Sequence, residues 1–162
     1  MGQLEARFGK VGAKGEAGEA YLFERLQKDF QVIDYRHDMI QQTQGIDFGI
    51  RKPEWRREYT LDVKNTLYIA PDDSFTSIKV ELECKGKPGW FFTSKADRIY
   101  HTNAFMKRYL YYDLNELRHY ITKKLLEQSP DFEIVHYNGD VLAQFRMFAT
   151  KQCNYPISDI FV

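Results

Sequence analysis

Residues 59–65, with the sequence YTLDVKN, alternate between apolar and polar side chains. A period of two is typical of a strand with one buried face, so Leu61 and Val63 are predicted on one face. The opposite face then carries Asp62 and Lys64 side by side. Because taking a carboxylate and an ammonium out of water costs free energy, this pair indicates a site that uses both charges.

Spacings of three and four residues predict two helices. The first is expected at about 15–29, where Leu22, Phe23, Leu26 and Phe30 form an apolar stripe. Projected at about 100° per residue, Glu19 falls within this stripe. A carboxylate on the buried side of a helix is costly unless it is paired, protonated or metal-bound, and a place at the exposed rim of the helix start is the alternative. The second helix is expected at about 114–127, with Asp113 as its cap.

The rest of the chain predicts extended segments joined by turns. Asp47 lies on the polar face of segment 45–50, and a turn at Pro53 makes 57–65 its antiparallel partner. Asn138-Gly139 predicts a second tight hairpin. Further extended segments are expected at 31–37, 77–84, 90–92, 132–137 and 141–149, with one or two more in 100–112. A loop is expected at 66–75, a turn at 85–89, a loop or short helix at 94–98, and coil from 155 onward.

Length and composition favour a single α/β domain. The chain has 162 residues, of which 43% are hydrophobic and 28% charged, and residues 1–13 form a Gly-rich basic leader expected to be flexible or to touch phosphate. No apolar run reaches membrane-spanning length and no signal-peptide pattern is present, so a cytoplasmic protein with no membrane partner is expected. Cys84 and Cys153 lack metal-ligand spacing and are expected as free thiols.

Three carboxylates and one lysine are expected to converge if the first helix packs on the hairpin. Glu19 comes from the helix, Asp47 from the first strand of the hairpin, and Asp62 with Lys64 from the second. Carboxylate oxygens suit a hard cation such as Mg²⁺, which polarises a phosphodiester oxygen and lowers the pKa of a bound water. An adjacent lysine can position that water and stabilise an anionic transition state. The net charge of zero argues against a protein that coats nucleic acid, but it leaves a nuclease open.

These residues resemble the PD-(D/E)xK nuclease superfamily. The acid–x–lysine strand of the family matches Asp62-Val63-Lys64, its preceding aspartate matches Asp47, and its helical glutamate matches Glu19. The run Lys14-Gly15-Glu16-Ala17-Gly18-Glu19 is similar to the first helix of archaeal Holliday-junction resolvases. The likeness covers about residues 14–65.

The resemblance implies a restriction-endonuclease-like mixed central sheet flanked by helices. It also implies a metal held by Asp47, Asp62 and the Val63 carbonyl, with Glu19 binding directly or through water, and a catalytic role for Lys64. Two departures stand out. Ile46 replaces the usual proline before the first aspartate, and an extended segment at 75–93 follows the lysine strand where the family often has a helix.

Other motifs compete with this interpretation. Glu83-Cys84-Lys85 is a second acid–x–lysine match, but it lacks an aspartate one hairpin upstream and a glutamate one helix earlier. The four histidines show no metal-ligand spacing. Trp90, Phe91 and Phe92 are expected either to stack on bases or, more commonly, to pack in a core or interface.

The sequence therefore predicts a Mg²⁺- or Mn²⁺-dependent DNA endonuclease. A stand-alone nuclease of this size fits branched or otherwise structured DNA in recombination and repair, or paired cuts by a homodimer, in the nucleoid or, if phage-encoded, in the host cytoplasm. Phosphate contacts are expected from Lys14, Lys85, Lys87 and Lys95, with Lys79 and Arg98 as further candidates. The alternatives are a homing or restriction-type endonuclease, a non-catalytic DNA-binding module on the same fold, and a structural protein.

Overall fold

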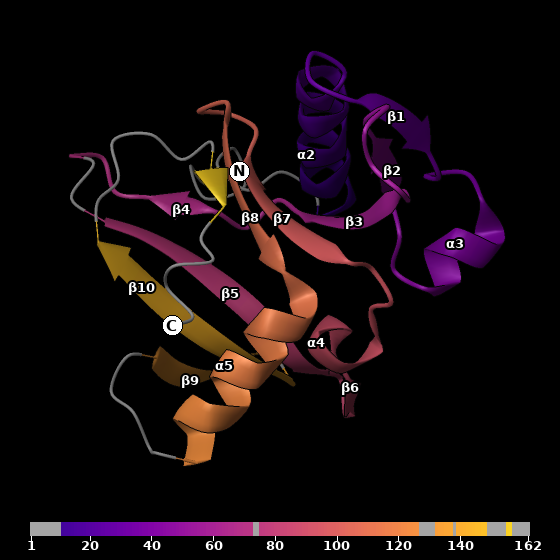
Figure 1. The fold of residues 1–162 in the computed structure, drawn as a ribbon. Coiled ribbons are helices and arrows are strands. Elements are labelled where there is room, and N and C mark those ends of the chain that lie inside the picture. The colour runs from indigo at the N-terminus through magenta and orange to yellow at the C-terminus, as the bar shows by residue number, and fades with distance from the viewer. Residues whose placement is uncertain (1–10, 73–74, 127–131, 138, 149–154, 157–162) are drawn as a thin grey trace.

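The computed structural model describes residues 11–72, 75–126, 132–137, 139–148 and 155–156, and it has a mixed α/β architecture (Figure 1). In chain order its elements are α2 (Val11–Leu26), β1 (Gln31–Asp34), α3 (Met39–Thr43), β2 (Phe48–Arg51), β3 (Tyr59–Lys64), β4 (Tyr68–Ile69), β5 (Phe75–Cys84), β6 (Lys87–Pro88), α4 (Trp90–Thr93), β7 (Arg98–Asn103), β8 (Arg108–Asp113), α5 (Leu114–Leu126), β9 (Phe132–Tyr137), β10 (Asp140–Phe148) and β11 (Tyr155–Pro156).

The strands form two sheets. The first is mixed and has the order β1-β2-β3-β7-β8-β11, while the second has the order β4-β5-β10-β9 with β6 paired to β5. β2 and β3 are antiparallel, with Phe48 opposite Leu61, as the alternation in the sequence predicted. β3 is parallel to β7, which places Lys64 opposite His101. The second predicted hairpin is also present, because Asp140 pairs with Tyr137 and Gly139 has a positive φ of 85°.

The first sheet is covered on both faces, as Figure 1 shows, with α2 on one side and the second sheet, α4 and α5 on the other. The α2 side holds one hydrophobic core, in which Leu22 and Leu26 meet Leu61, Val63 and Tyr100. A second core joins both sheets to α4 and α5. It contains Leu67, Ile69, Ile78, Val80, Phe91, Ile99, Leu110, Tyr112, Leu114, Leu117 and Ile121. The apolar face of β3 therefore turns toward α2.

Helix α2 starts earlier than the sequence predicted. It begins at Val11 rather than Gly15 and ends at Leu26, so the expectation of a flexible leader is wrong for residues 11–13, and residues 1–10 lie outside the described chain. Gly18 is where this helix comes closest to the sheet. A Cβ added there would lie 2.6 Å from Asn65 Cβ and 2.7 Å from Thr102 Oγ1. The missing side chain lets the helix approach β3 and β7 at the turn that carries Glu19.

The aromatic run at 90–92 was predicted as extended and is instead the start of helix α4. Aromatic residues favour strands, but tertiary contacts decide here. The Gly89 N–H donates to Leu82 O, and the Arg118 guanidinium of α5 donates to Phe91 O at 2.8 Å and to Ser94 O at 2.7 Å. Residues 94–97 that follow have neither helix nor strand structure.

Other element boundaries differ from the predicted ones by smaller amounts. The predicted loop at 66–75 contains the short strand β4, and the predicted turn at 85–89 contains β6. The region 100–112 supplies two strands, β7 and β8. Of the predicted coil from 155 onward, Tyr155–Pro156 pairs with β8 as β11, and residues 157–162 lie outside the described chain. Within the described residues, no helix is both long and apolar enough to cross a membrane.

Two of the three glycines of α2, Gly15 and Gly18, predict opposite effects of substitution by alanine. Gly18→Ala should destabilise the fold by about 1–3 kcal/mol, because a methyl group would collide with Asn65 Cβ and Thr102 Oγ1. Gly15→Ala meets no atom within 4 Å and should be neutral or stabilising by up to about 1 kcal/mol, because alanine favours a helix. Urea denaturation of both variants measures the difference. Equal effects would contradict a close approach at Gly18.

Candidate functional site

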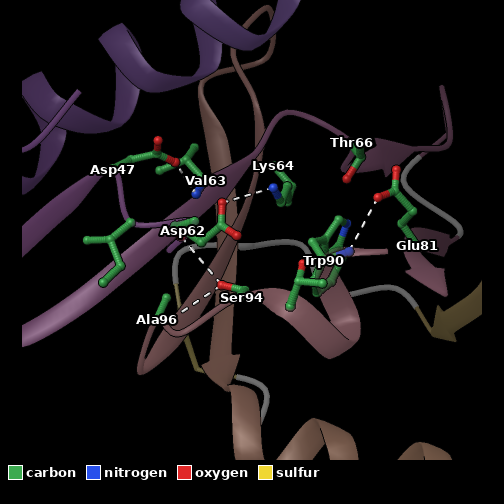
Figure 2. A network of polar contacts seen from close by, with 12 residues as sticks. Asp47, Asp62, Val63, Lys64, Thr66, Glu81, Trp90, Ser94 and Ala96 are labelled. Atoms are coloured by element: carbon green, nitrogen blue, oxygen red, sulfur yellow. Dashed lines mark hydrogen bonds and ion pairs between the residues drawn. The ribbon is translucent and has the colours of Figure 1, made fainter. Parts of the chain in front are cut away.

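The β2–β3 hairpin fixes the carboxylate of Asp47. The Asp47 N–H donates to Leu61 O at 2.8 Å, and the Asp47 carboxylate in turn accepts from the Val63 N–H, 2.8 Å from Oδ2. On the other side, Gln42 Nε2 lies 3.3 Å from Asp47 Oδ1 and 2.8 Å from Ile46 O. Asp47 is 8% exposed. Its side chain is therefore held against the backbone of β3 (Figure 2).

Asp62 is more deeply buried, with 2% of its surface exposed. Its Oδ1 lies 3.0 Å from the Lys64 ammonium, which is the pairing that the strand pattern predicted. Its Oδ2 is buried and has no hydrogen-bond partner among the described residues. Ser94 lies beside it, but the Ser94 hydroxyl donates to Gly45 O at 3.4 Å. One carboxylate oxygen of Asp62 is thus left with unused acceptor capacity, which is costly in a buried position.

Burial and, to a smaller extent, the charge of Asp47 raise the pKa of Asp62 to about 6 against the opposing charge of Lys64. Burial likewise raises the pKa of Glu19 to about 7, with added repulsion from Asp47, Glu16 and Asp62, while Arg36 lowers it. The charges of Asp47 and Asp62 thus act on Glu19, which is half-buried. The structure pairs Asp62 directly with Lys64 and holds Asp47 against Val63 of the same strand.

The neighbours of Lys64 lie on other helices and strands, which the sequence patterns did not link to this lysine. The Lys64 ammonium lies 5.5 Å from the centre of the Trp90 ring, and the Trp90 N–H donates to Glu81 Oε1 at 3.3 Å (Figure 2). On the neighbouring strand, burial and then the Lys64 charge lower the pKa of His101 to about 3. His101 is therefore neutral, and it bonds to the Tyr112 hydroxyl and, at 2.9 Å, to Thr66 Oγ1.

Four residues of the site were missed by sequence reasoning. Gln42 fixes Asp47, Ser94 lies beside Asp62, Trp90 faces Lys64, and Arg36 carries its positive charge toward Glu19 and Asp47. Trp90 was noted as aromatic but not as a neighbour of the lysine. The residue pairs lie on different elements, so no periodicity in the chain links them.

The set of side chains is suited to a hard cation with an incomplete protein cage. Among the described residues no group of three or more His, Cys, Asp or Glu side chains is gathered closely enough to hold a metal ion by itself. Mg²⁺ commonly binds through one or two carboxylates and keeps several waters. The unpartnered Asp62 Oδ2 fits that ligand set, and Asp47, whose charge acts on the Asp62 carboxyl, is the second candidate carboxylate.

The competing acid–x–lysine motif lies elsewhere. Glu83 pairs with Pro88 at the end of β5 in the second sheet, and Lys85 follows in a turn with a positive φ of 49°. Neither contributes to the charges acting on Glu19 or Asp62. The predicted phosphate contacts Lys85, Lys87 and Lys95 are exposed, and the side chain of Lys14 is outside the described part of the chain.

The predicted pair of free thiols is confirmed for Cys84, whereas Cys153 lies outside the described residues. Comparison of the chain with protein-family models, curated proteins and solved structures finds no match in any of the three.

The raised pKa of Asp62 predicts a pH dependence of stability without metal. The folded-state pKa of about 6 exceeds the ordinary value of 3.8, so the free energy of unfolding falls as the pH rises from about 4 to about 6 and the loss is complete above pH 6. Asp62→Asn removes that loss. Its melting temperature, relative to wild type, should therefore rise by several degrees between pH 5 and pH 8 in EDTA.

Asp97→Asn is the matched control. Despite its partial burial, the pKa of Asp97 is lowered, by hydrogen bonds from Arg57 and the Thr60 N–H. The stabilisation that ionised Asp97 gives is complete above its ordinary pKa and is lost only in acid. Asp97→Asn should therefore be less stable than wild type by a constant amount from pH 5 to pH 8. If the melting temperatures of Asp62→Asn and wild type change in parallel from pH 5 to pH 8, the raised pKa of Asp62 is refuted.

Proposed function

We propose that this chain is a Mg²⁺- or Mn²⁺-dependent endodeoxyribonuclease. The observation that carries the proposal is the buried Asp62 carboxylate, whose Oδ2 has no partner within the described residues while its Oδ1 holds Lys64 at 3.0 Å. A structural ion pair would gain by satisfying both oxygens, because an unpaired buried acceptor costs about 1–3 kcal/mol. A site that must accept a cation keeps one oxygen available.

Asp47 and Asp62 would hold the cation, with Glu19 and the Val63 carbonyl completing its surroundings. When bound, the cation supplies charge neutralisation at the phosphodiester and acidifies its water. The fit rests on the donor set, in which hard carboxylate oxygens predominate. It rests also on the mutual repulsion that raises the pKa values of Glu19 and Asp62, since a cation among them would relieve that repulsion.

Lys64 would orient the attacking water and stabilise the negative charge that develops on the phosphate. Its ammonium is held from two sides, by Asp62 Oδ1 and by the face of Trp90. An ammonium fixed in this way keeps its direction through the reaction, and little reorganisation is needed when charge develops. Gln42 and the Val63 N–H hold Asp47 in the same manner.

The fold supports a restriction-endonuclease-like assignment. A helix carrying the glutamate precedes an antiparallel hairpin carrying both aspartates, and the lysine strand β3 is next to a parallel strand, β7. The mixed first sheet lies between α2 and the layer with α4 and α5. In the chain, β4, β5 and β6 of the second sheet come between the lysine strand and its parallel neighbour, where the extended segment at 75–93 was expected, and β9 and β10 of that sheet follow α5.

The substrate class favoured here is branched or otherwise structured DNA, cut by a homodimer in the cytoplasm. The net charge of zero gives the chain no overall excess of positive charge for sequence-independent duplex binding, so recognition of a DNA shape is the simpler route. Homing or restriction-type cleavage is the alternative for an active enzyme. A non-catalytic DNA-binding module would have no need of the Lys64–Asp62 pair.

Lys64→Ala should lower the cleavage rate by at least about 100-fold, because a donor that stabilises the transition state is removed. The measurement is a panel of linear, flapped and four-way DNA with Mg²⁺. Lys28→Ala, an exposed lysine on the chain segment after α2, is the control and should cut at the wild-type rate. If Lys64→Ala cuts as fast as wild type, the assignment of the lysine is wrong.

Millimolar Mg²⁺ or Mn²⁺ should raise the melting temperature of the wild type at pH 8, because a ligand that binds only the folded state stabilises it. Asp62→Asn should lose this shift, since the charge that attracts the cation is gone. Asp97→Asn, away from the site, should keep it. An equal shift in all three proteins would indicate non-specific binding.

A further inference from the structure

The turn between β7 and β8, residues 104–107, presents an apolar tip to solvent. Phe105 is 96% exposed and Met106 is 37% exposed. The turn is nevertheless ordered by its own contacts. The Met106 N–H donates to Asn103 Oδ1 at 2.9 Å, Asn103 Nδ2 donates to Leu67 O at 3.2 Å, and Lys107 has a positive φ of 53°. These contacts hold the Phe105 ring away from the core and open to solvent.

The base of this turn is tied to the candidate site. Asn65, which follows Lys64 directly, accepts hydrogen bonds at Oδ1 from Thr102 Oγ1 at 2.9 Å and from the Ala104 N–H at 3.2 Å. Gly18 of α2 approaches the same two side chains, Asn65 and Thr102. The turn is therefore positioned by the strand that carries Lys64 and lies against the helix turn that carries Glu19.

The turn also projects beyond the site in a defined direction. β7 runs parallel to β3 with His101 opposite Lys64, so the chain continues past the lysine into the turn between β7 and β8 (Figure 1). Phe105 follows His101 by four residues, the last two of them in the turn, so at about 3.3 Å per residue it lies at most roughly 13 Å further along, or about four base steps at 3.4 Å. Lys107 and Arg108 follow the apolar tip, and the run 103–109 contains no acid.

Building on the proposed nuclease function, we propose that the 104–107 turn is a wedge that inserts Phe105 against an opened base step of branched DNA, within about four nucleotides of the cleaved phosphodiester. Apolar side chains that enter between bases unstack them, and flanking cations hold the phosphates. A continuous duplex resists this insertion, whereas a branch point exposes base faces already. The wedge thereby selects discontinuous DNA.

A second copy of the chain is a weaker fit for this tip. One aromatic side chain buries about 150–250 Å², whereas a stable interface needs about 800 Å² from each partner. A single stacked base, by contrast, needs no more than the face of one ring. The basic residues next to the tip match a phosphate backbone in charge.

The test uses the full chain in EDTA, so that binding is followed without cleavage. A four-way junction and a linear duplex of the same arm sequence carry 2-aminopurine at successive positions from the branch. Wild type should increase the fluorescence on the junction, with a maximum within about four nucleotides of the cut mapped with Mg²⁺, and should leave the linear duplex unchanged.

Phe105→Ala should abolish the fluorescence increase and weaken junction binding about 10-fold by anisotropy, because base–aromatic stacking is lost. Phe105→Trp should restore both. Lys107→Ala is the comparison variant: it should weaken junction and linear duplex equally and lower the salt dependence of binding by about one ion. Thermal melts establish that each variant is folded.

The wedge is overturned if Phe105→Ala binds and unstacks the junction like wild type, if wild type binds no DNA, or if Phe105→Ala only converts a dimer to a monomer in sedimentation. Cleavage separates the two proposals. Unstacking without Mg²⁺-dependent cleavage by wild type removes the nuclease function and supports the wedge. Equal junction cleavage by wild type and Phe105→Ala removes the wedge and supports the nuclease.

Discussion

The register between β2 and β3 is the constraint on which the site depends. The Asp47 N–H bonds to Leu61 O, and the Asp47 carboxylate accepts from the Val63 N–H, so the first aspartate is fixed on both sides by the strand that presents the second. A slip of one residue would turn Asp62 and Lys64 to the α2 core and Leu61 to the site. The burial of Leu61 and Val63 under α2 prevents that slip. The hydrophobic core thereby sets the geometry of the charges.

The site is held in an electrostatically unfavourable state. Burial and mutual repulsion raise the pKa values of Asp62 and Glu19 toward neutrality, and the single ion pair with Lys64 does not cancel them. Perturbed groups of this kind cluster where chemistry is done, because a purely structural cluster would evolve toward complete pairing. A protein of zero net charge can still have a strong electrostatic field at this site, because the charges of its acidic side chains act on one another there.

Local patterns predicted the parts of this site that depend on one element, or on two neighbours in the chain. The alternation at 59–65 gave the Asp62–Lys64 pair, and the turn at Pro53 gave the hairpin that brings Asp47 to Val63. Trp90 was assigned wrongly to an extended segment because its helix is determined by Gly89 and Arg118 rather than by the aromatic run. Contacts between distant elements carry no periodic signal, so Ser94 and Arg36 were also missed.

The chain segment between β3 and β7 connects the second sheet to the site. Placing β7 parallel to β3 requires a crossover, and here the crossover contains β5 and α4 rather than one long helix. β5 supplies Glu81, which fixes the Trp90 N–H, and Arg118 of α5 fixes the carbonyls of Phe91 and Ser94. Trp90 and Ser94 are then held against Lys64 and Asp62 from the face opposite α2. The second sheet thus acts as the support for one wall of the site, and its packing fixes the direction of the lysine.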